Sequence, residues 1–329
     1  MIKHLFICFV PLAICCSLIF AKHANGKFII TCFEMKDIGR GAGLAVLLQT
    51  PNGHAYLYDA GIGYPSKTDP SGWVGNFNAG RDVIAPFLRK NNIHAIDGVV
   101  ISHAHLDHYG GLLWLVDHFP IRKLYDGGYE FHGPLPPDWQ SELGGYSQLR
   151  NRFRKRPGGY QEIHTGDKLN WDSSLDVEVL APSRHYFGEP HPEKRSTKDP
   201  PAHYLVNANS TDLRIRHGNV VFLFPGDIEK EDQVQSLLKS VPGEKFKCDI
   251  LIAPGHGINS CQSPEFAEAT RPKVVIASLL ARWLKGNQSP ALYGKFGGKV
   301  YFTAVEGQIR VVSDGVHYRV QTERGAKSL

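Results

Sequence analysis

Four residues of the types that bind metal ions lie close together in the sequence: His103, His105, Asp107 and His108. Residues 96–101 before them are apolar and β-branched, which predicts a strand, and residues 112–118 after them predict a helix. The four therefore lie where a strand ends. They cannot all lie on one face of a strand or helix, so we expect a loop that folds them around a metal ion. Neutral imidazoles and a carboxylate suit zinc, manganese or iron(II).

Two further candidate ligands follow apolar strands downstream. Asp227 comes after residues 221–226, and His256 comes after residues 249–255. Read alone, Asp227 is typical of a turn or helix cap and His256 of an ordinary loop histidine. Read together with the upstream cluster, both are expected to complete a metal site.

Strands and a few helices must position these side chains. Strands are predicted over residues 28–33, 44–50, 55–59, 96–101, 175–180, 213–215, 220–224, 249–253, 273–279, 299–303, 308–312 and 317–321, and helices over 82–91, 112–118 and 229–240. Residues 126–170 are rich in glycine, proline and aromatic residues and predict no regular pattern, and residues 181–202 predict a surface loop. Two halves of this α/β pattern lack a linker between them, which favours one domain with sheet packed on sheet and helices outside.

The first 24 residues have the pattern of a signal peptide. Lys3 and His4 precede an almost uncharged run over residues 5–20, and small and polar residues follow. We therefore expect a mature domain over residues 25–329, secreted or periplasmic, with no membrane-spanning segment left after cleavage. An uncleaved N-terminal membrane anchor is the alternative. After cleavage three cysteines remain, which excludes a disulfide framework, and the formal charge of +5 permits an anionic partner without requiring one.

The order of these motifs resembles the metallo-β-lactamase superfamily. The motifs are the Asp59-Ala60-Gly61 turn, the SHAHLDHYGG run, the PGD that ends in Asp227 and the PGHG around His256. The resemblance implies an αββα sandwich with metals at one edge between the two sheets. Later segments, NANS, FLFPGDIEKED, DILIAPGHGINS and EGQIRVVSDG, are similar to the hydrolase domain that ends ComEC-type competence proteins.

The resemblance also implies roles for single residues. His103 and His105 would bind one divalent ion, zinc or manganese, and Asp107 and His108 a second. Asp227 would bridge the two ions and His256 would complete the second site. Asp107 and Asp227 are thereby the candidate catalytic residues, acting with a metal-bound hydroxide on a phosphodiester. Asp59 would be the buried carboxylate that orients the cluster.

Three positions depart from the pattern of the resembled families. Asn207 or Asn209 lies near the place of a histidine that many superfamily enzymes have before the bridging aspartate. Gly255 replaces the first of two histidines in the competence branch, and Ser289 replaces a histidine that this branch often has before proline. The last two changes remove groups that could contact the substrate or donate a proton.

A cluster of arginines allows two interpretations. Arg150, Arg152 and Arg154 could bind phosphates beside the site, or they could form a solvated helix end. Among the other histidines, His203 is the best candidate for an additional ligand.

Taken together, these features predict a secreted metal-dependent hydrolase, with nucleic acid or a small phosphodiester as substrate. A hydrolase of another exported ester, and a metal-stabilised nucleic-acid-binding module with little turnover, are the alternatives. No feature of the sequence specifies an oligomeric state.

Overall fold

The structure is a computed structural model that describes residues 26–188, 201–229 and 231–325. The predicted signal peptide, residues 1–24, lies outside the described residues. Within the described part, no helix is both long and apolar enough to cross a membrane. The remaining cysteines, Cys32, Cys248 and Cys261, are all buried, and no disulfide joins any two of them.

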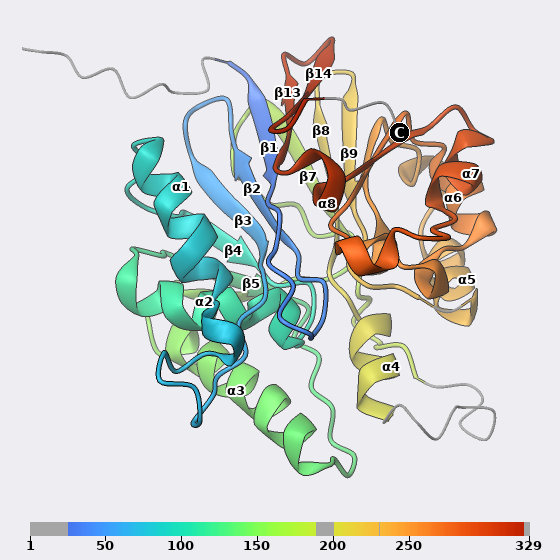
Figure 1. Cartoon of the computed structure of the whole chain (residues 1–329). Helices are drawn as coiled ribbons and strands as arrows, with labels where there is room; N and C mark the ends of the chain where they lie inside the picture. Colours follow the sequence, from blue (N-terminus) through green and yellow to red (C-terminus); the bar gives the residue numbers. More distant parts are fainter. Residues whose placement is uncertain (1–25, 189–200, 230, 326–329) are drawn as a thin grey trace, which may run out of the picture.

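The described chain forms two sheets that pack face to face (Figure 1). The first has the strand order β14-β13-β1-β2-β3-β4-β5-β6 and the second β12-β11-β10-β9-β8-β7. The strands of the first sheet are β1 (Phe28–Cys32), β2 (Ala45–Gln49), β3 (Ala55–Ala60), β4 (Gly98–Val100), β5 (Leu124–Asp126), β6 (Tyr160–Glu162), β13 (Ile309–Ser313) and β14 (Tyr318–Thr322). Those of the second are β7 (Leu175–Ala181), β8 (Asp212–His217), β9 (Val220–Phe224), β10 (Ile250–Ile252), β11 (Val274–Ala277) and β12 (Lys299–Phe302).

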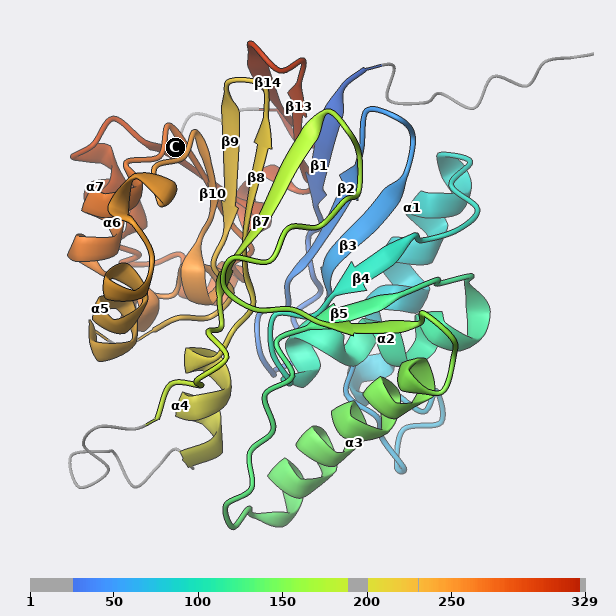
Figure 2. The same cartoon turned by 180° about the vertical axis from the view of Figure 1, so that it is seen from behind.

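Helices cover the outer face of each sheet, so the layers are α, β, β and α (Figures 1 and 2). The helices over the first sheet are α1 (Ala85–Lys90), α2 (Leu106–His118) and α3 (Pro137–Arg154). Those over the second are α5 (Glu231–Ser240), α6 (Pro264–Thr270) and α7 (Ser289–Gly294); α4 (Pro201–Ala208) lies at the lower end and α8 (Thr303–Glu306) follows β12. The predicted αββα sandwich is confirmed.

Alternating side chains explain why the strands of the first sheet are buried on both faces. In β2, Val46 and Leu48 join the core between the sheets, whereas Ala45 and Leu47 join the core beneath α1 and α2. A third core lies between the second sheet and helices α5 to α7. Because successive side chains of a strand point to opposite faces, an apolar run of this kind fits a strand covered on both sides.

Five helices, α3, α4, α6, α7 and α8, were not predicted from the sequence. Residues 126–170 were expected to lack a regular pattern, yet α3 is an 18-residue helix that buries Tyr146, Leu149 and Phe153 against the first sheet. The pair Gly144-Gly145 and the prolines before the helix obscured it, and packing of its apolar stripe outweighs that weak propensity. The expected surface loop over residues 181–202 is followed by α4, which brings His203 beside the cluster.

Candidate metal centre

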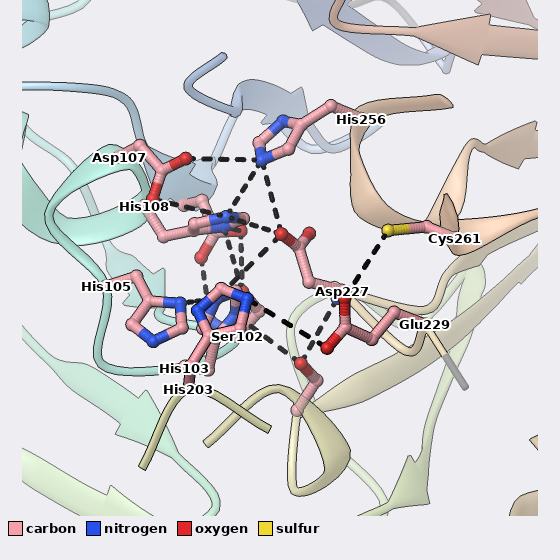
Figure 3. Close-up of polar contacts among 12 residues, drawn as sticks. Ser102, His103, His105, Asp107, His108, His203, Asp227, Glu229, His256 and Cys261 are labelled. Carbon is pink, nitrogen blue, oxygen red and sulfur yellow. Dashed lines mark hydrogen bonds and ion pairs between the residues drawn. The ribbon is translucent and has the colours of Figure 1, made fainter. Parts of the chain in front are cut away.

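The predicted ligands meet at one edge of the sandwich, where strands of both sheets end (Figure 3). His103 and His105 follow β4, Asp227 follows β9, and His256 lies in a short turn after β10. The loop expected for the cluster was wrong in one respect, because α2 begins at Leu106 and places Asp107 and His108 in its first turn. Glu142 of α3 explains this early start, since its carboxylate accepts a hydrogen bond of 2.7 Å from the free amide of Leu106.

Two groups of side chains have the spacing of metal ligands. One consists of His103, His108 and Asp227, and the other of Asp107, His108 and His256. In each group, one ligand atom per residue lies within 4.8 Å of the others. His108 belongs to both groups, with its Nε2 atom 3.2 Å from Asp227 Oδ2 and 3.2 Å from His256 Nε2. The geometry therefore offers two adjacent candidate positions for a cation.

His105 lies beside these groups but belongs to neither of them. Its Nδ1 atom is 2.9 Å from His103 Nε2, and its buried Nε2 atom has no hydrogen-bond partner among the described residues. His203 of α4 stacks on the His105 ring, with centroids 5.1 Å apart, and Trp139 of α3 packs against it edge-on. The expected pairing of His103 with His105 around one ion stays a prediction.

Asp59 lies beneath the cluster and holds His108 in orientation. Its carboxylate accepts hydrogen bonds from the Ser102 amide (2.7 Å), the Ser102 hydroxyl (2.8 Å) and His108 Nδ1 (2.7 Å). This contact leaves Nε2 of His108 to face Asp227 and His256. Asp59 has a φ of +56°, a left-handed conformation that aspartate tolerates better than most residues.

Electrostatics divide the histidines into two pairs. Burial lowers the pKa of His103 and His105 well below the usual value, so both imidazoles are neutral. Burial also acts to lower the pKa of His108 and His256. Nearby carboxylates, Asp227 first among them, outweigh it and raise the pKa of His108 well above its usual value and that of His256 to about 9.

The carboxylates show the reciprocal effect. Burial alone would raise the pKa of Asp107 and Asp227, but His108 and His256 hold both below the usual value for aspartate. Asp107 and Asp227 thus stay ionised although they are buried, which requires a compensating positive charge near them, where the rings of His108 and His256 approach each other. Within the described residues, Nε2 of His105 and Oδ1 of Asp227 are also buried without a hydrogen-bond partner, and together with the carboxylates this arrangement fits divalent cations.

The asparagines expected near the missing histidine lie behind the cluster. Asn209 hydrogen bonds to the backbone of Phe187 and Leu205, and it lines the same small cavity as His103. Asn207 is buried, and its side-chain oxygen has no partner among the described residues. From the same segment Ser210 contacts His103: its hydroxyl lies 3.4 Å from Nδ1 and accepts a hydrogen bond from the Asp227 amide.

The structure also gives a physical reason for glycine at position 255. A Cβ atom there would lie 2.2 Å from Cys261 Sγ, and the backbone has a φ of +51°. Cys261 therefore fills the space that a side chain at position 255 would need. Ser289 is fully buried, and its hydroxyl donates to the Gly257 carbonyl, so it supports the turn that carries His256.

The three arginines proposed for substrate binding occupy different environments. Arg150 is 2% exposed, and its guanidinium donates to Asp126 and Glu130 at 2.7 Å each. Arg152 is exposed and pairs with Asp117, and Arg154 is exposed with its guanidinium 4.7 Å from the centre of the Tyr160 ring. Within the described part of the chain, none of these three guanidiniums hydrogen bonds or pairs with a residue of the two ligand groups.

Sequence reasoning missed the contribution of α3 to the centre. Trp139 and Glu142 reach the cluster from this helix, and burial raises the pKa of Glu142 to about 7. A signal was present, because Trp139, Tyr146 and Phe153 recur at helical spacing and lie on one side of a helix.

The fold and the ligand cluster define a metallo-β-lactamase-type protein, and comparison with known families agrees. Residues 38–259 match the model of the metallo-beta-lactamase superfamily, and the chain belongs to that superfamily. Its His and Asp cluster is a plausible metal site of a metal-dependent hydrolase.

Particular relatives narrow this assignment to a branch. The chain is 26% identical to ComE operon protein 3 of Bacillus subtilis over 274 residues, which cover 80% of this chain and 30% of that protein. It is also 26% identical to competence protein ComA of Neisseria gonorrhoeae over 238 residues, covering 72% of this chain and 26% of that protein. The chain is thus a distant homologue of ComEC-type competence proteins, and it spans less than a third of their length.

A shorter match and a solved structure complete the comparison. Ribonuclease J of Corynebacterium glutamicum is 28% identical over 95 residues, 28% of this chain and 11% of that protein. The metallo-beta-lactamase fold protein YhfI from Bacillus subtilis aligns with a TM-score of 0.46 and 14% identity, covering 84% of this chain and 95% of that one.

Proposed function

We propose that this protein is an exported, metal-dependent phosphodiesterase whose first substrate class is nucleic acid. The observation that carries the proposal is the pair of adjacent ligand groups that share His108. Adjacent sites of this kind suit a phosphodiester, because two cations can act on the attacking and the leaving oxygen of one in-line displacement. The homology to competence proteins and the shorter match to a ribonuclease support nucleic acid as the source of that phosphodiester.

The chain would hold two divalent ions, zinc or manganese, one beside His103 and Asp227 and one beside Asp107 and His256. His108 lies between these positions, and because Asp59 engages its Nδ1 atom, the single lone pair of its Nε2 atom would serve one of the two ions. Ions bound there would supply Lewis acidity toward phosphoryl oxygens and lower the pKa of a water molecule. Asp107 and Asp227 contribute charge, because both carboxylates remain ionised although they are buried. Asp59 and Ser102 hold His108 in one orientation, and the neighbouring imidazoles of His103 and His105 are neutral and free to act as ligands.

The test combines metal content with hydrolysis by the purified protein. Zinc and manganese are quantified, and cleavage of single-stranded DNA, double-stranded DNA and bis(p-nitrophenyl) phosphate is measured with each metal added back. Asp227→Asn and His108→Ala are compared with Asp117→Asn, a matched change at an exposed carboxylate on the outer surface of α2. We expect the first two variants to lose bound metal and at least about 100-fold in hydrolysis, and Asp117→Asn to keep both.

Three results would contradict the proposal in different ways. Unchanged metal content and hydrolysis in Asp227→Asn would overturn the site. Two bound metals with cleavage of carboxylic esters or thioesters, and of no phosphodiester, would move the assignment to another ester. Tight, salt-dependent DNA binding without cleavage would instead support a binding module.

A further inference from the structure

A cavity of about 310 Å³ lies next to the metal centre. It is partly open to solvent and is lined by α3, by the segment over residues 129–135 and by Val206 of α4. Ala104 forms part of its wall, and this residue stands between His103 and His105. Figure 2 shows α3 and α4 at this end of the molecule, with the segment that leads into α3 between them. A group bound in the cavity would therefore lie beside whatever occupies the metal centre.

The chemistry of the walls favours an uncharged aromatic ring. Tyr129, Phe131 and Tyr146 contribute rings, and aromatic side chains of this kind stack on planar ligands. The only buried cation in the wall, within the described residues, is Arg150, whose donors already serve Asp126, Glu130 and the Tyr129 carbonyl. These bonds use three of the five guanidinium N–H donors and pair the group with two carboxylates, Asp126 and Glu130, whose negative charge disfavours a phosphate beside it.

Arg150 also disfavours a quaternary ammonium ligand. Its guanidinium carbon lies 4.9 Å from the centre of the Tyr146 ring, so one aromatic face of the wall is already occupied by a cation. Arg150 would repel a second cation, and the Glu130 carboxylate that also lines the cavity offsets only part of this repulsion because it is already paired with Arg150. The volume lies at the lower end of the range for small-molecule pockets, which suits a single ring system rather than a peptide or a folded oligonucleotide.

From these observations we propose that the cavity binds one nucleobase of the substrate, with the adjoining phosphodiester at the metal centre. This inference rests on the proposed function and adds to it a base-binding subsite built mainly by α3. Hydrogen-bonding groups are present for the edge of a base. The side chain of Gln140 donates to the Leu135 carbonyl, which leaves its amide oxygen as an acceptor, and Ser147 offers a hydroxyl.

Gly144 makes the cavity testable. It lies in the middle of α3 and lines the cavity, and a Cβ atom added there would meet no heavy atom within 4 Å. Gly144→Phe should fill the cavity without a clash at the backbone, whereas Gly144→Ala changes the same residue and leaves the space open. Phe131→Ala is a second probe, because it removes an aromatic wall instead of filling the cavity.

The experiment compares two chromogenic diesters that differ in one nucleoside. Thymidine 5′-(p-nitrophenyl phosphate) carries a base, and methyl p-nitrophenyl phosphate does not. In Gly144→Phe we expect kcat/KM for the thymidine substrate to fall at least about 10-fold while that for the methyl substrate stays unchanged, and in Phe131→Ala a fall of at least about 5-fold. Gly144→Ala should match the unmodified protein on both substrates, and thermal melting checks that all three variants fold.

Binding of thymidine 5′-monophosphate, inorganic phosphate and phosphocholine by calorimetry separates this inference from the proposed function. If no diester is hydrolysed, the proposed function fails. The subsite would still be supported if Gly144→Phe lost binding of thymidine monophosphate while Gly144→Ala and the unmodified protein kept it. Equal hydrolysis of both diesters by Gly144→Phe and the unmodified protein would overturn the subsite while leaving the phosphodiesterase intact. An equal fall on both substrates, or preferential binding of phosphocholine, would also overturn the assignment to a nucleobase.

Discussion

Replacing Arg150 by methionine should destabilise the fold, whereas the same change at Arg152 should not. Arg150 is 2% exposed and makes three hydrogen bonds, to Asp126, Glu130 and the Tyr129 carbonyl. Arg152 forms an exposed ion pair with Asp117. Methionine preserves most of the length of either side chain. The two variants therefore differ mainly in the carboxylate that loses its partner, which is buried in one case and exposed in the other.

The expected magnitude follows from the environment of Asp126. Removing one partner of a buried ion pair costs about 3–5 kcal/mol, because the other charge stays buried without compensation. Asp126 is 3% exposed but keeps the hydroxyls of Tyr146 and Tyr160 and the Gly128 amide as donors. We therefore expect the lower end of that range, about 3 kcal/mol. An exposed pair contributes only about 0–1 kcal/mol, which is the loss expected in Arg152→Met.

Urea unfolding measures both losses in free energy, provided that the slope with urea concentration is unchanged between the variants. Adding Asp126→Asn to Arg150→Met removes the stranded charge, so the double variant should be less destabilised than the sum of the two single changes. If Arg150→Met unfolds within about 1 kcal/mol of the unmodified protein and loses phosphodiester hydrolysis, this reasoning is wrong. Arg150 would then act on the substrate, as the sequence allowed.

Three other predictions test separate features. Burial raises the pKa of Asp212 well above the usual value, and neither of its oxygens has a partner among the described residues. The folded protein therefore loses stability as the pH rises above about 4, because the carboxyl ionises more readily in the unfolded chain. Measured by urea unfolding, the stability of Asp212→Asn relative to the unmodified protein should increase between about pH 5 and pH 8. Asp59→Asn should weaken metal binding about 10- to 100-fold in chelator competition, because it loosens the orientation of His108. Gly111→Ala should cost about 1–3 kcal/mol, because its Cβ would lie 1.9 Å from the Ala60 carbonyl oxygen; Gly144→Ala meets nothing and should gain up to about 1 kcal/mol from helix propensity.

Each of these predictions has a result that contradicts it. A stability difference between Asp212→Asn and the unmodified protein that does not vary with pH would mean that the carboxyl does not change its ionisation on folding. Unaltered metal affinity in Asp59→Asn would show that His108 is oriented without it. A Gly111→Ala variant as stable as the unmodified protein would mean that α2 can move away from β3.

Most strands could be predicted because their side-chain pattern is local. Runs such as residues 44–50 and 220–224 are largely apolar, and each lies between two cores that cover its two faces. The positions of His103, Asp227 and His256 at strand ends were predicted for the same reason. By contrast, α3 combines glycines and charged residues with a sparse apolar stripe, and only its packing on the first sheet explains a helix of 18 residues.

The arginines of α3 show the same limit at the level of single side chains. Arg150 and Arg152 are the same residue type, two positions apart in one helix. Two positions correspond to rotation by about 200°, so the two side chains lie on nearly opposite sides. Which side faces the first sheet cannot be read from the charges, and the structure alone separates the buried ion pair from the exposed one.

The sequence by itself determined the types of ligand, their order along the chain and the strands that carry them. Tertiary structure decided which ligands share a position, because the decisive contacts join residues far apart in the chain. His108 meets Asp227 across 119 residues and His256 across 148. No local pattern fixes a distance of 3.2 Å over such separations, since that distance depends on how the two sheets pack and where helix α2 begins.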